Sequence, residues 1–134
     1  MKIITIGERS ELSEHAFDNA PLGISLVRTD GKFLKVNNCL CTMLGYSESE
    51  LLKKSFHDIT DPNDQEISDY FCNKLISGEL SSVHFEKRYF TKGHSIIWVR
   101  LHSSLKKDFS RKPLYFITHI ENITNQKKAE VQVF

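Results

Sequence analysis

The stretch from Val36 to Asp64 reads VNNCLCTMLGYSESELLKKSFHDITDPND and carries the start and stop signals of several short helices. Asn37 or Asn38 can cap a first helix, because an asparagine side chain accepts a hydrogen bond from the free N–H groups of the first turn. Ser47 begins a second helix, and Glu50 three residues later completes an S-x-x-E capping box. Small helices chained in this way predict a helical wrap that encloses a sheet.

The sequence on both sides of this stretch predicts the strands to be enclosed. Residues 10–19 favour a short helix with Leu12 and Phe17 as buried candidates. Alternating apolar residues between turn signals predict strands at residues 23–29, 32–36, 81–91, 95–107 and 113–123. The longest helix is expected at residues 62–77, with an apolar face formed by Ile67, Tyr70, Phe71, Leu75 and Ile76. This order predicts an α+β domain with one antiparallel sheet.

The composition limits the partners and the compartment. A chain of 134 residues is long enough for one domain with a real core. With 18 basic and 17 acidic residues the net charge is +1, so the overall charge does not favour nucleic acid or an anionic membrane as a partner. The sequence shows neither a signal peptide nor a transmembrane segment, and 3 cysteines, an odd number, fit a reducing compartment. We therefore expect a cytoplasmic module without direct membrane contact.

Seven segments of the chain are similar to a known family. They read FDNAPLGISLV, DGKFLKVN, LGYSESELL, SFHDITDPND, FEKRY, SIIWVRL and PLYFITHIENIT, and together they extend over roughly residues 16–126. In sequence and in order they resemble a PAS domain. The resemblance implies a five-stranded antiparallel sheet of strand order 2-1-5-4-3, covered on one face by short helices and one longer helix. It also implies a sensory and dimerisation module of a cytoplasmic signalling protein, such as a histidine kinase of a two-component system or a cyclic-di-GMP enzyme.

The resemblance suggests a division of the chain. Residues 1–9 are expected to be an N-terminal extension, residues 10–123 the PAS domain with its flanking helix, and residues 124–134 the start of a helix that leads to a covalently attached effector. The last strand of the family commonly ends in Asp-Ile-Thr, whereas this chain has Asn122, Ile123 and Thr124 at this signal exit. An amide in place of the carboxylate keeps a hydrogen bond but loses an ion pair.

PAS domains often hold a small ligand between the sheet and the helical wrap, and apolar or mixed side chains could line such a pocket here. The candidates are Ile24, Leu26, Leu44, Phe56, Ile59, Phe71, Leu75, Tyr89, Val99, Leu101, Ser103, Phe116, Thr118 and Ile120. Two interpretations remain open: a core filled by these side chains, or a cavity for a small organic ligand oriented by Tyr89, Ser103 and Thr118.

The resemblance also allows two cofactors to be considered, and the residues disfavour both. Flavin photochemistry in the family needs a cysteine where this chain has Phe56, and it needs amide side chains where the chain has Tyr89, Val99 and Ile120. Haem is usually ligated by a histidine on the long helix, but residues 62–77 contain none. We therefore expect neither flavin nor haem, and an unknown small ligand is the remaining candidate.

Three histidines are predicted to form a row on the outer face of the sheet. If the two hairpins turn at their loop centres, paired residue numbers sum to about 186 in the first hairpin and about 221 in the second. His102 then lies between His84 and His119, and Glu86 lies opposite Arg100. The row could bind a metal ion or respond to pH, or it could consist of ordinary polar positions.

No catalytic motif stands out in the sequence, so an enzyme is not expected. The preferred hypothesis is a non-catalytic sensory module that forms a homodimer through the helix before Pro21 and through an outer sheet face with Trp98 and Ile117. The alternative is a purely structural dimerisation domain with a filled core and no ligand.

Overall fold

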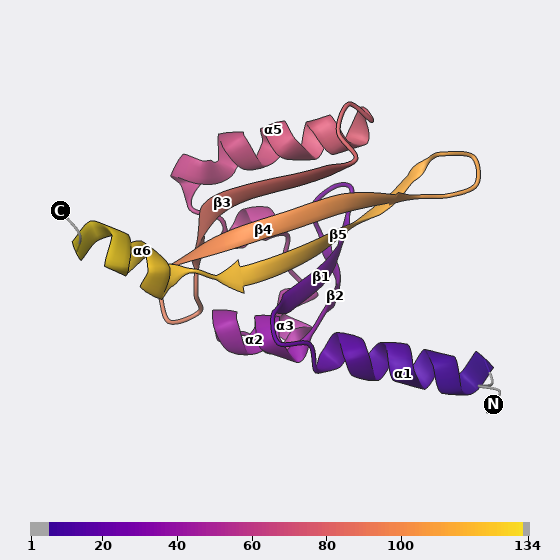
Figure 1. Ribbon diagram of the computed structural model, residues 1–134, viewed down its shortest axis with the longest axis horizontal. Coiled ribbons are helices and arrows are strands. Elements are labelled where there is room, and N and C mark those ends of the chain that lie inside the picture. Colours follow the sequence, from indigo (N-terminus) through magenta and orange to yellow (C-terminus); the bar gives the residue numbers. More distant parts are fainter. Residues whose placement is uncertain (1–5, 133–134) are drawn as a thin grey trace.

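The computed structural model describes residues 6–132, which form one curved antiparallel sheet with helices packed on its inner face (Figure 1). The elements are α1 (Ile6–Asp18), β1 (Gly23–Arg28), β2 (Phe33–Val36), α2 (Asn38–Leu44), α3 (Glu48–Leu51), α4 (Phe56–Ile59), the 3-10 turn η1 (Pro62–Asp64), α5 (Gln65–Ile76), β3 (Ser82–Phe90), β4 (Ile96–Lys107), β5 (Pro113–Asn122) and α6 (Thr124–Gln132). The strand order is β2-β1-β5-β4-β3, which confirms the predicted α+β fold.

The expected helix signals operate in the wrap. The buried side chain of Asn37 accepts hydrogen bonds from the N–H groups of Leu40 and Ile24, and it donates to the carbonyl groups of Phe17 and Leu22. One amide thus joins the end of α1, the start of β1 and the start of α2. This arrangement identifies Asn37, of the two predicted candidates, as the helix cap.

The other caps form as well. Ser47 and Glu50 complete the predicted capping box of α3. The carboxylate of Asp61 accepts a hydrogen bond from the N–H of Asn63 and thereby begins η1, with Pro62 at the first helical position. These caps hold the wrap in place as a series of short rigid turns.

The register of the long meander agrees with the prediction. His84 lies opposite His102, and Glu86 lies opposite Arg100, as in a pairing whose residue numbers sum to 186. His102 lies opposite His119 in the second hairpin. The alternation of side chains along β3 and β4 is therefore fixed, with one set facing the helices and the other facing outward.

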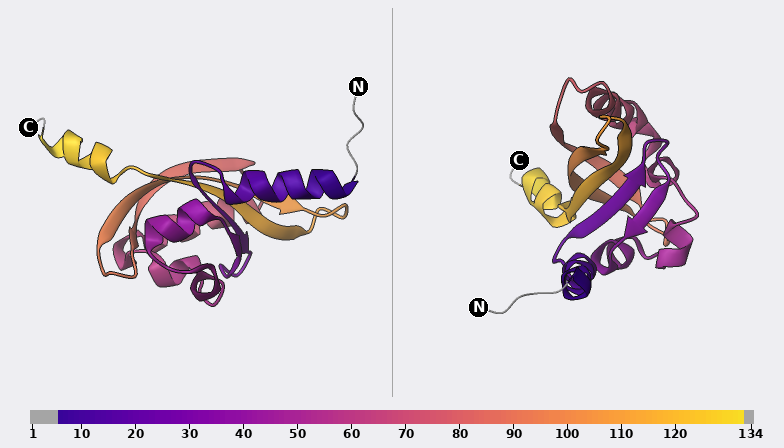
Figure 2. Two further views of the ribbon diagram at one scale, coloured as in Figure 1. Left: turned by 90° about the horizontal axis from the view of Figure 1, so that it is seen from below. Right: turned by 90° about the vertical axis from the view of Figure 1, so that its right-hand side faces the viewer.

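The core lies between the inner face of the sheet and helices α2 to α5. Its most deeply buried apolar side chains are Leu40, Leu44, Leu51, Ile59, Leu75, Val99 and Ile120. Helices α1 and α6 take no part in this layer and extend from opposite ends of the domain (Figure 2). Within residues 6–132 no helix is both long enough and apolar enough to cross a membrane.

The long helix differs from its prediction in where it begins and which side it buries. Residues 62–64 form the 3-10 turn, and the α-helix starts at Gln65. Ile67, Tyr70 and Ile76 are exposed, so the predicted apolar face is partly wrong. Phe71 and Leu75 face inward as predicted, but they are joined there by Ser68 and Cys72 in place of Ile67, Tyr70 and Ile76.

The first helix also differs from expectation. It begins at Ile6 and includes part of the expected N-terminal extension, of which residues 1–5 lie outside the described part of the chain. Leu12 was expected to be buried but is 57% exposed, because α1 extends away from the core, whereas Phe17 near its end is partly buried. At the other end, α6 starts at Thr124 as expected.

Candidate functional site

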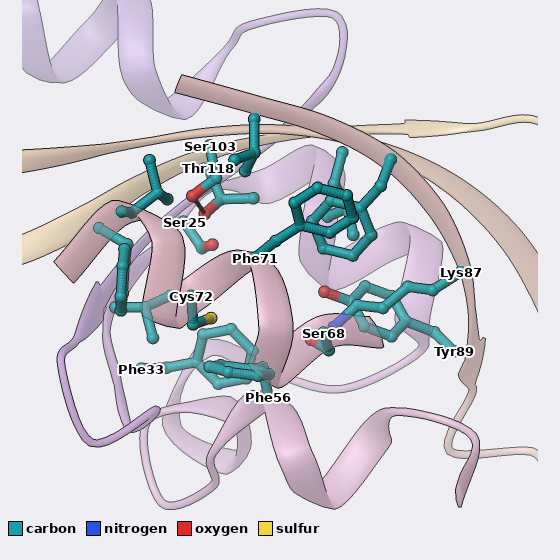
Figure 3. A pocket seen from close by; sticks show the side chains of 16 residues that line it. Ser25, Phe33, Phe56, Ser68, Phe71, Cys72, Lys87, Tyr89, Ser103 and Thr118 are labelled. Carbon is teal, nitrogen blue, oxygen red and sulfur yellow. Dashed lines mark hydrogen bonds between the residues drawn. The ribbon is translucent and has the colours of Figure 1, made fainter. Parts of the chain in front are cut away.

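A cavity of about 40 Å³ lies between the inner face of the sheet and α5 (Figure 3). Its lining consists of Ser25, Val27, Phe33, Phe56, Ser68, Phe71, Cys72, Leu75, Val83, Phe85, Lys87, Tyr89, Leu101, Ser103, Phe116 and Thr118. All five strands supply the sheet side, β2 with Phe33 alone, and α5 supplies most of the opposite side. Apolar and aromatic side chains dominate this lining, with a few polar groups among them.

The structure brings together eight of the fourteen predicted pocket residues. Those that line the cavity are Phe56, Phe71, Leu75, Tyr89, Leu101, Ser103, Phe116 and Thr118. Leu44, Ile59, Val99 and Ile120 are buried in the core but do not line the cavity.

The prediction for β1 is wrong by one residue. Ser25 and Val27 face the cavity, whereas Ile24 and Leu26 point to the other face of the sheet and are only partly buried. Ser25 pairs with Thr118 and Val27 pairs with Phe116, so the cavity face of β5 determines that of β1. The sequence favoured Ile24 and Leu26 because large apolar side chains usually face the core.

Sequence reasoning missed Lys87, the most unusual residue of the site. Its side chain is only 2% exposed, and its Nζ donates hydrogen bonds to Ser68 Oγ at 2.8 Å and to Thr60 Oγ1 at 3.1 Å. The same Nζ lies 4.7 Å from the ring centre of Phe56 and 5.0 Å from that of Tyr89. The sequence did contain a signal for this orientation. Residues two apart on a strand share a face, and Tyr89 was expected to point inward, so Lys87 should point inward as well.

Burial shifts the pKa values of the titratable groups in the cavity. It lowers the pKa of Lys87 to about 8, because a desolvated ammonium is disfavoured. Burial raises the pKa of Cys72 to about 11 and also raises the pKa of Tyr89, so the thiol and the phenol are neutral at pH 7. Lys87 is therefore the one lining residue whose charge can respond near neutral pH among the described residues.

A second polar group belongs to the sheet side of the cavity. The hydroxyl groups of Ser103 and Thr118 are 2.9 Å apart and share a hydrogen bond across β4 and β5. Ser25 is the neighbour of Thr118 on β1. Figure 3 shows these three residues on one side of the cavity and Lys87, Ser68 and Tyr89 on another. A ligand in the space between them would meet polar groups at two ends and apolar side chains along its length.

The histidine row exists, but it does not form a metal site. The rings of His84 and His102 stack at 4.2 Å with 7° between their planes, and His119 follows at 5.9 Å. Nitrogen lone pairs lie in the ring plane, so parallel rings cannot direct them to one ion. Among residues 6–132, no three His, Cys, Asp or Glu side chains are placed so that they could hold one metal ion. Desolvation, and then the two neighbouring imidazoles, lower the pKa of His102.

The predicted signal exit is tied to β4. The amide oxygen of Asn122 accepts hydrogen bonds from the N–H and the hydroxyl of Thr124, and that hydroxyl accepts one from the N–H of Trp98. The N–H of Ile123 donates to the carbonyl of Trp98 at 2.9 Å. The start of α6 is therefore fixed to the beginning of β4.

Side chains extend this attachment to the outer face. Lys127 of α6 lies 2.6 Å from the carboxylate of Glu86, and its Nζ lies 5.0 Å above the ring of Trp98. Arg88 contacts the same ring and also binds Asp64 at the start of α5 through three hydrogen bonds of 2.8 to 2.9 Å. Asp64 therefore joins the start of α5 to β3.

Comparisons with known proteins agree with this geometry. The family model described as "PAS domain" matches residues 21–125. The chain is 37% identical over 129 residues to the probable diguanylate cyclase DgcE of Escherichia coli (strain K12), covering 92% of the chain. It is 26% identical over 114 residues to the sensor histidine kinase TmoS of Ectopseudomonas mendocina, covering 85% of the chain. It spans only 12% of the length of each of these relatives.

Solved structures share the fold. A PAS domain from Colwellia psychrerythraea superposes with a TM-score of 0.80 at 17% identity, covering 87% of this chain and 98% of that one. The PAS domain of an HTR-like protein from Haloarcula marismortui gives a TM-score of 0.75 at 25% identity, covering 88% of this chain and 94% of that one. The family model matches most of the chain, and the sheet order and helical wrap are those of its neighbours. The chain belongs to the PAS domain family, the sensory domains of signalling proteins.

Proposed function

We propose that this domain is a non-catalytic sensor that binds a small organic ligand in the cavity and passes the signal to an attached effector. The effector would be a histidine kinase or a cyclic-di-GMP enzyme within a larger cytoplasmic protein. Both curated relatives are much longer than the chain, and their names include a sensor kinase and a diguanylate cyclase, which supports this assignment. The residues matched in them make up a small part of each relative.

The observation that carries the proposal is the cavity between α5 and the sheet. A domain that served only as a scaffold would gain stability from filling this space, because a cavity forfeits packing contacts. Here apolar side chains surround the space while hydroxyl groups and one amine point toward it. Such a mixture of apolar walls and few polar groups is typical of small-molecule sites.

We propose that neither flavin nor haem occupies this site. Phe56 stands at the position where flavin photochemistry would need a thiol, and its ring stacks on His57 at 4.2 Å. On α5 the inward side chains are Ser68, Phe71, Cys72 and Leu75, which offer no imidazole for iron. The cavity volume also favours a ligand much smaller than either cofactor.

We propose that two copies of the domain associate through α1, as in the expectation from the sequence. The exposed Leu12 on α1 and the position of this helix away from the core support a second copy as its partner. Trp98 fits this role less well than expected, because Arg88 and Lys127 already cover its ring. Light scattering of the wild type and of Leu12→Lys tests the interface, since a lysine there would lower the dimer fraction.

Native mass spectrometry of the purified chain, paired with an absorption spectrum, tests the sensor proposal. A co-purified small mass per chain without a flavin or haem band supports it. The variant Cys72→Leu should lose this mass, because the larger side chain enters the cavity, whereas Cys39→Leu, on α2 outside the lining, should keep it. Bare protein that no small molecule stabilises would contradict the proposal.

A further inference from the structure

Lys87 carries a buried charge for which the described part of the chain supplies no anionic partner. Its two hydrogen-bond partners, Thr60 and Ser68, are neutral hydroxyl groups. An ammonium group has three N–H donors, so one donor is not used by these two contacts. Removing a charge from water is costly unless an opposite charge or enough acceptors replace the water. The cavity therefore contains a cationic group with capacity for one further acceptor.

The two acidic side chains whose charges act on Lys87 are already paired with other residues. Asp64 and Asp69 act on its charge through space, but neither forms an ion pair with it. Asp64 binds Arg88, and Asp69 binds His57 at 3.0 Å. The aromatic faces of Phe56 and Tyr89 attract the ammonium without offering a strong hydrogen-bond acceptor. A molecule in the cavity can supply the third acceptor.

The size and lining of the cavity limit what this molecule can be. Its volume is about 40 Å³, so only a molecule of a few non-hydrogen atoms fits without movement of the walls. Phe71, Leu75 and Leu101 line the same cavity and offer an apolar surface. A small molecule with one anionic end and a short apolar body matches both features.

Building on the proposed sensory function, we infer that the ligand is a short-chain carboxylate, with its carboxylate group on Lys87 Nζ and its alkyl group against α5. The carboxylate would accept the free N–H of Lys87 in a charge-assisted hydrogen bond. Ser68 and Thr60 hold the amine in place for this contact. On the other side of the cavity, the Ser103 and Thr118 pair limits the length of the alkyl chain (Figure 3).

This recognition depends on pH in a defined direction. Binding needs the ammonium form, and burial lowers the pKa of Lys87 to about 8. The other titratable groups that act on it are Cys72, Asp64 and Asp69, and Tyr89 lies beside it on β3. Burial raises the pKa of Cys72 and of Tyr89, so both stay neutral up to higher pH, and the hydrogen bond from Arg88 lowers the pKa of Asp64. Affinity for a carboxylate should therefore fall between about pH 7 and about pH 9 as Lys87 loses its proton.

Calorimetric titration of the full 134-residue chain with acetate, propionate and butyrate, each against its amide, tests the inference. Chloride solutions of equal ionic strength correct for nonspecific salt effects. We expect at least one acid to bind about tenfold or more tighter than its amide, because a hydrogen bond to a charged group is the stronger kind. Lys87→Met, which keeps the side-chain length, should remove this preference. Lys106→Met, at an exposed position of β4, should retain it.

The outcomes separate this inference from the proposed function. Amides that bind as tightly as the acids, or a Lys87→Met variant that keeps the preference, would overturn the carboxylate assignment while the sensor proposal stands. A wild type that binds none of these probes but retains another, uncharged molecule in native mass spectrometry would also overturn it. If neither probes nor co-purified molecules bind at all, the sensor proposal itself fails.

Discussion

Glu86 and Lys87 are consecutive residues of β3 whose side chains serve opposite faces of the sheet. Lys87 Nζ lies in the cavity, 2.8 Å from Ser68 Oγ on α5, whereas the carboxylate of Glu86 lies 2.6 Å from Nζ of Lys127 on α6. Two residues joined by one peptide bond therefore contact the cavity on one face of the sheet and α6 on the other. A ligand that displaces Lys87 would act on the strand whose Glu86 pairs with α6.

Weakening the outer contact should loosen α6 without emptying the cavity. In Lys127→Met the ion pair with Glu86 and the contact with Trp98 are both lost, so amides of α6 should exchange with solvent faster. Trp98 is the single tryptophan, and its fluorescence should shift as its ring becomes more exposed. Lys128→Met, at the exposed neighbouring position, is the matched control. Unchanged exchange and fluorescence in Lys127→Met would show that α6 is held by its backbone contacts alone.

A double-mutant cycle between Glu86→Gln and Lys127→Met measures the ion pair. Both side chains are about one-third exposed, so the coupling should be under about 1 kcal/mol and should decrease with added salt. Urea denaturation provides the four free energies of unfolding. A coupling near zero at low salt would mean that the pair does not contribute to the attachment of α6.

Replacing Lys87 should change the pH dependence of stability. The folded protein releases the Lys87 proton near pH 8, whereas an unfolded chain releases it near 10.5. Between these values the unfolded chain binds more protons, so this group makes the folded state more stable as pH rises. The free energy of unfolding of wild type minus that of Lys87→Met should therefore increase by about 3 kcal/mol over this interval.

Urea denaturation across this pH interval measures that difference, and subtraction of the variant removes most of the opposing effects of Cys72 and Tyr89. Lys106→Met should show no such slope. A constant difference between wild type and Lys87→Met would mean that Lys87 keeps its ordinary pKa and is not desolvated in solution.

Asp64→Asn should weaken the connection between α5 and β3. Asp64 accepts three hydrogen bonds from Arg88, which also hold down the pKa of this carboxyl. Loss of the charge should lower the free energy of unfolding by about 1 to 2 kcal/mol at neutral pH. The loss is no larger because the carboxylate of Asp61 remains near the Arg88 guanidinium. Because a lowered pKa stabilises the fold above the unfolded value of 3.8, the cost should shrink as the pH falls below it. Glu66→Gln, exposed on α5, is the control in urea denaturation, and equal stability of both variants would contradict the prediction.

His102, in the middle of the histidine row, should have a pKa below the usual value. Desolvation and the neighbours His84 and His119 lower the pKa of His102 from 6.5, so its neutral form is favoured in the folded protein. Its stabilising contribution is then present above 6.5 and lost as the pH falls. An NMR titration should place the His102 midpoint below 6.5, and His84→Gln should move it upward. If His84→Gln leaves the midpoint where it was, the stacked neighbour does not affect the titration.

The sequence predicted the framework of the domain well because its signals are local. Caps at Asn37 and Ser47 and the turn around Gly93 depend on a few adjacent residues, and counting from the turns placed His84, His102 and His119 in one row. Strand register follows from turn position and period-two alternation, so it could be predicted before any contact was known.

The cavity was harder to predict because it depends on contacts between distant segments. Lys87 was not considered since a lysine is rarely buried, and only the hydroxyl groups of Thr60 and Ser68, far away in sequence, make its burial tolerable. Ile24 and Leu26 were expected inside on the strength of their size. The face of β1 is in fact set by pairing with β5, which no local pattern records.

Backbone amide chemical shifts during a titration with propionate test the central claim most directly, because they report the cavity and α6 in one experiment. We predict saturable changes at cavity residues such as Ser68, Lys87 and Thr118, accompanied by changes around Lys127 on α6. The changes should disappear in Lys87→Met and persist in Lys106→Met. Changes that do not saturate, or that occur at surface lysines while the cavity residues and α6 stay unchanged, would contradict the binding of a carboxylate at Lys87 and its coupling to α6.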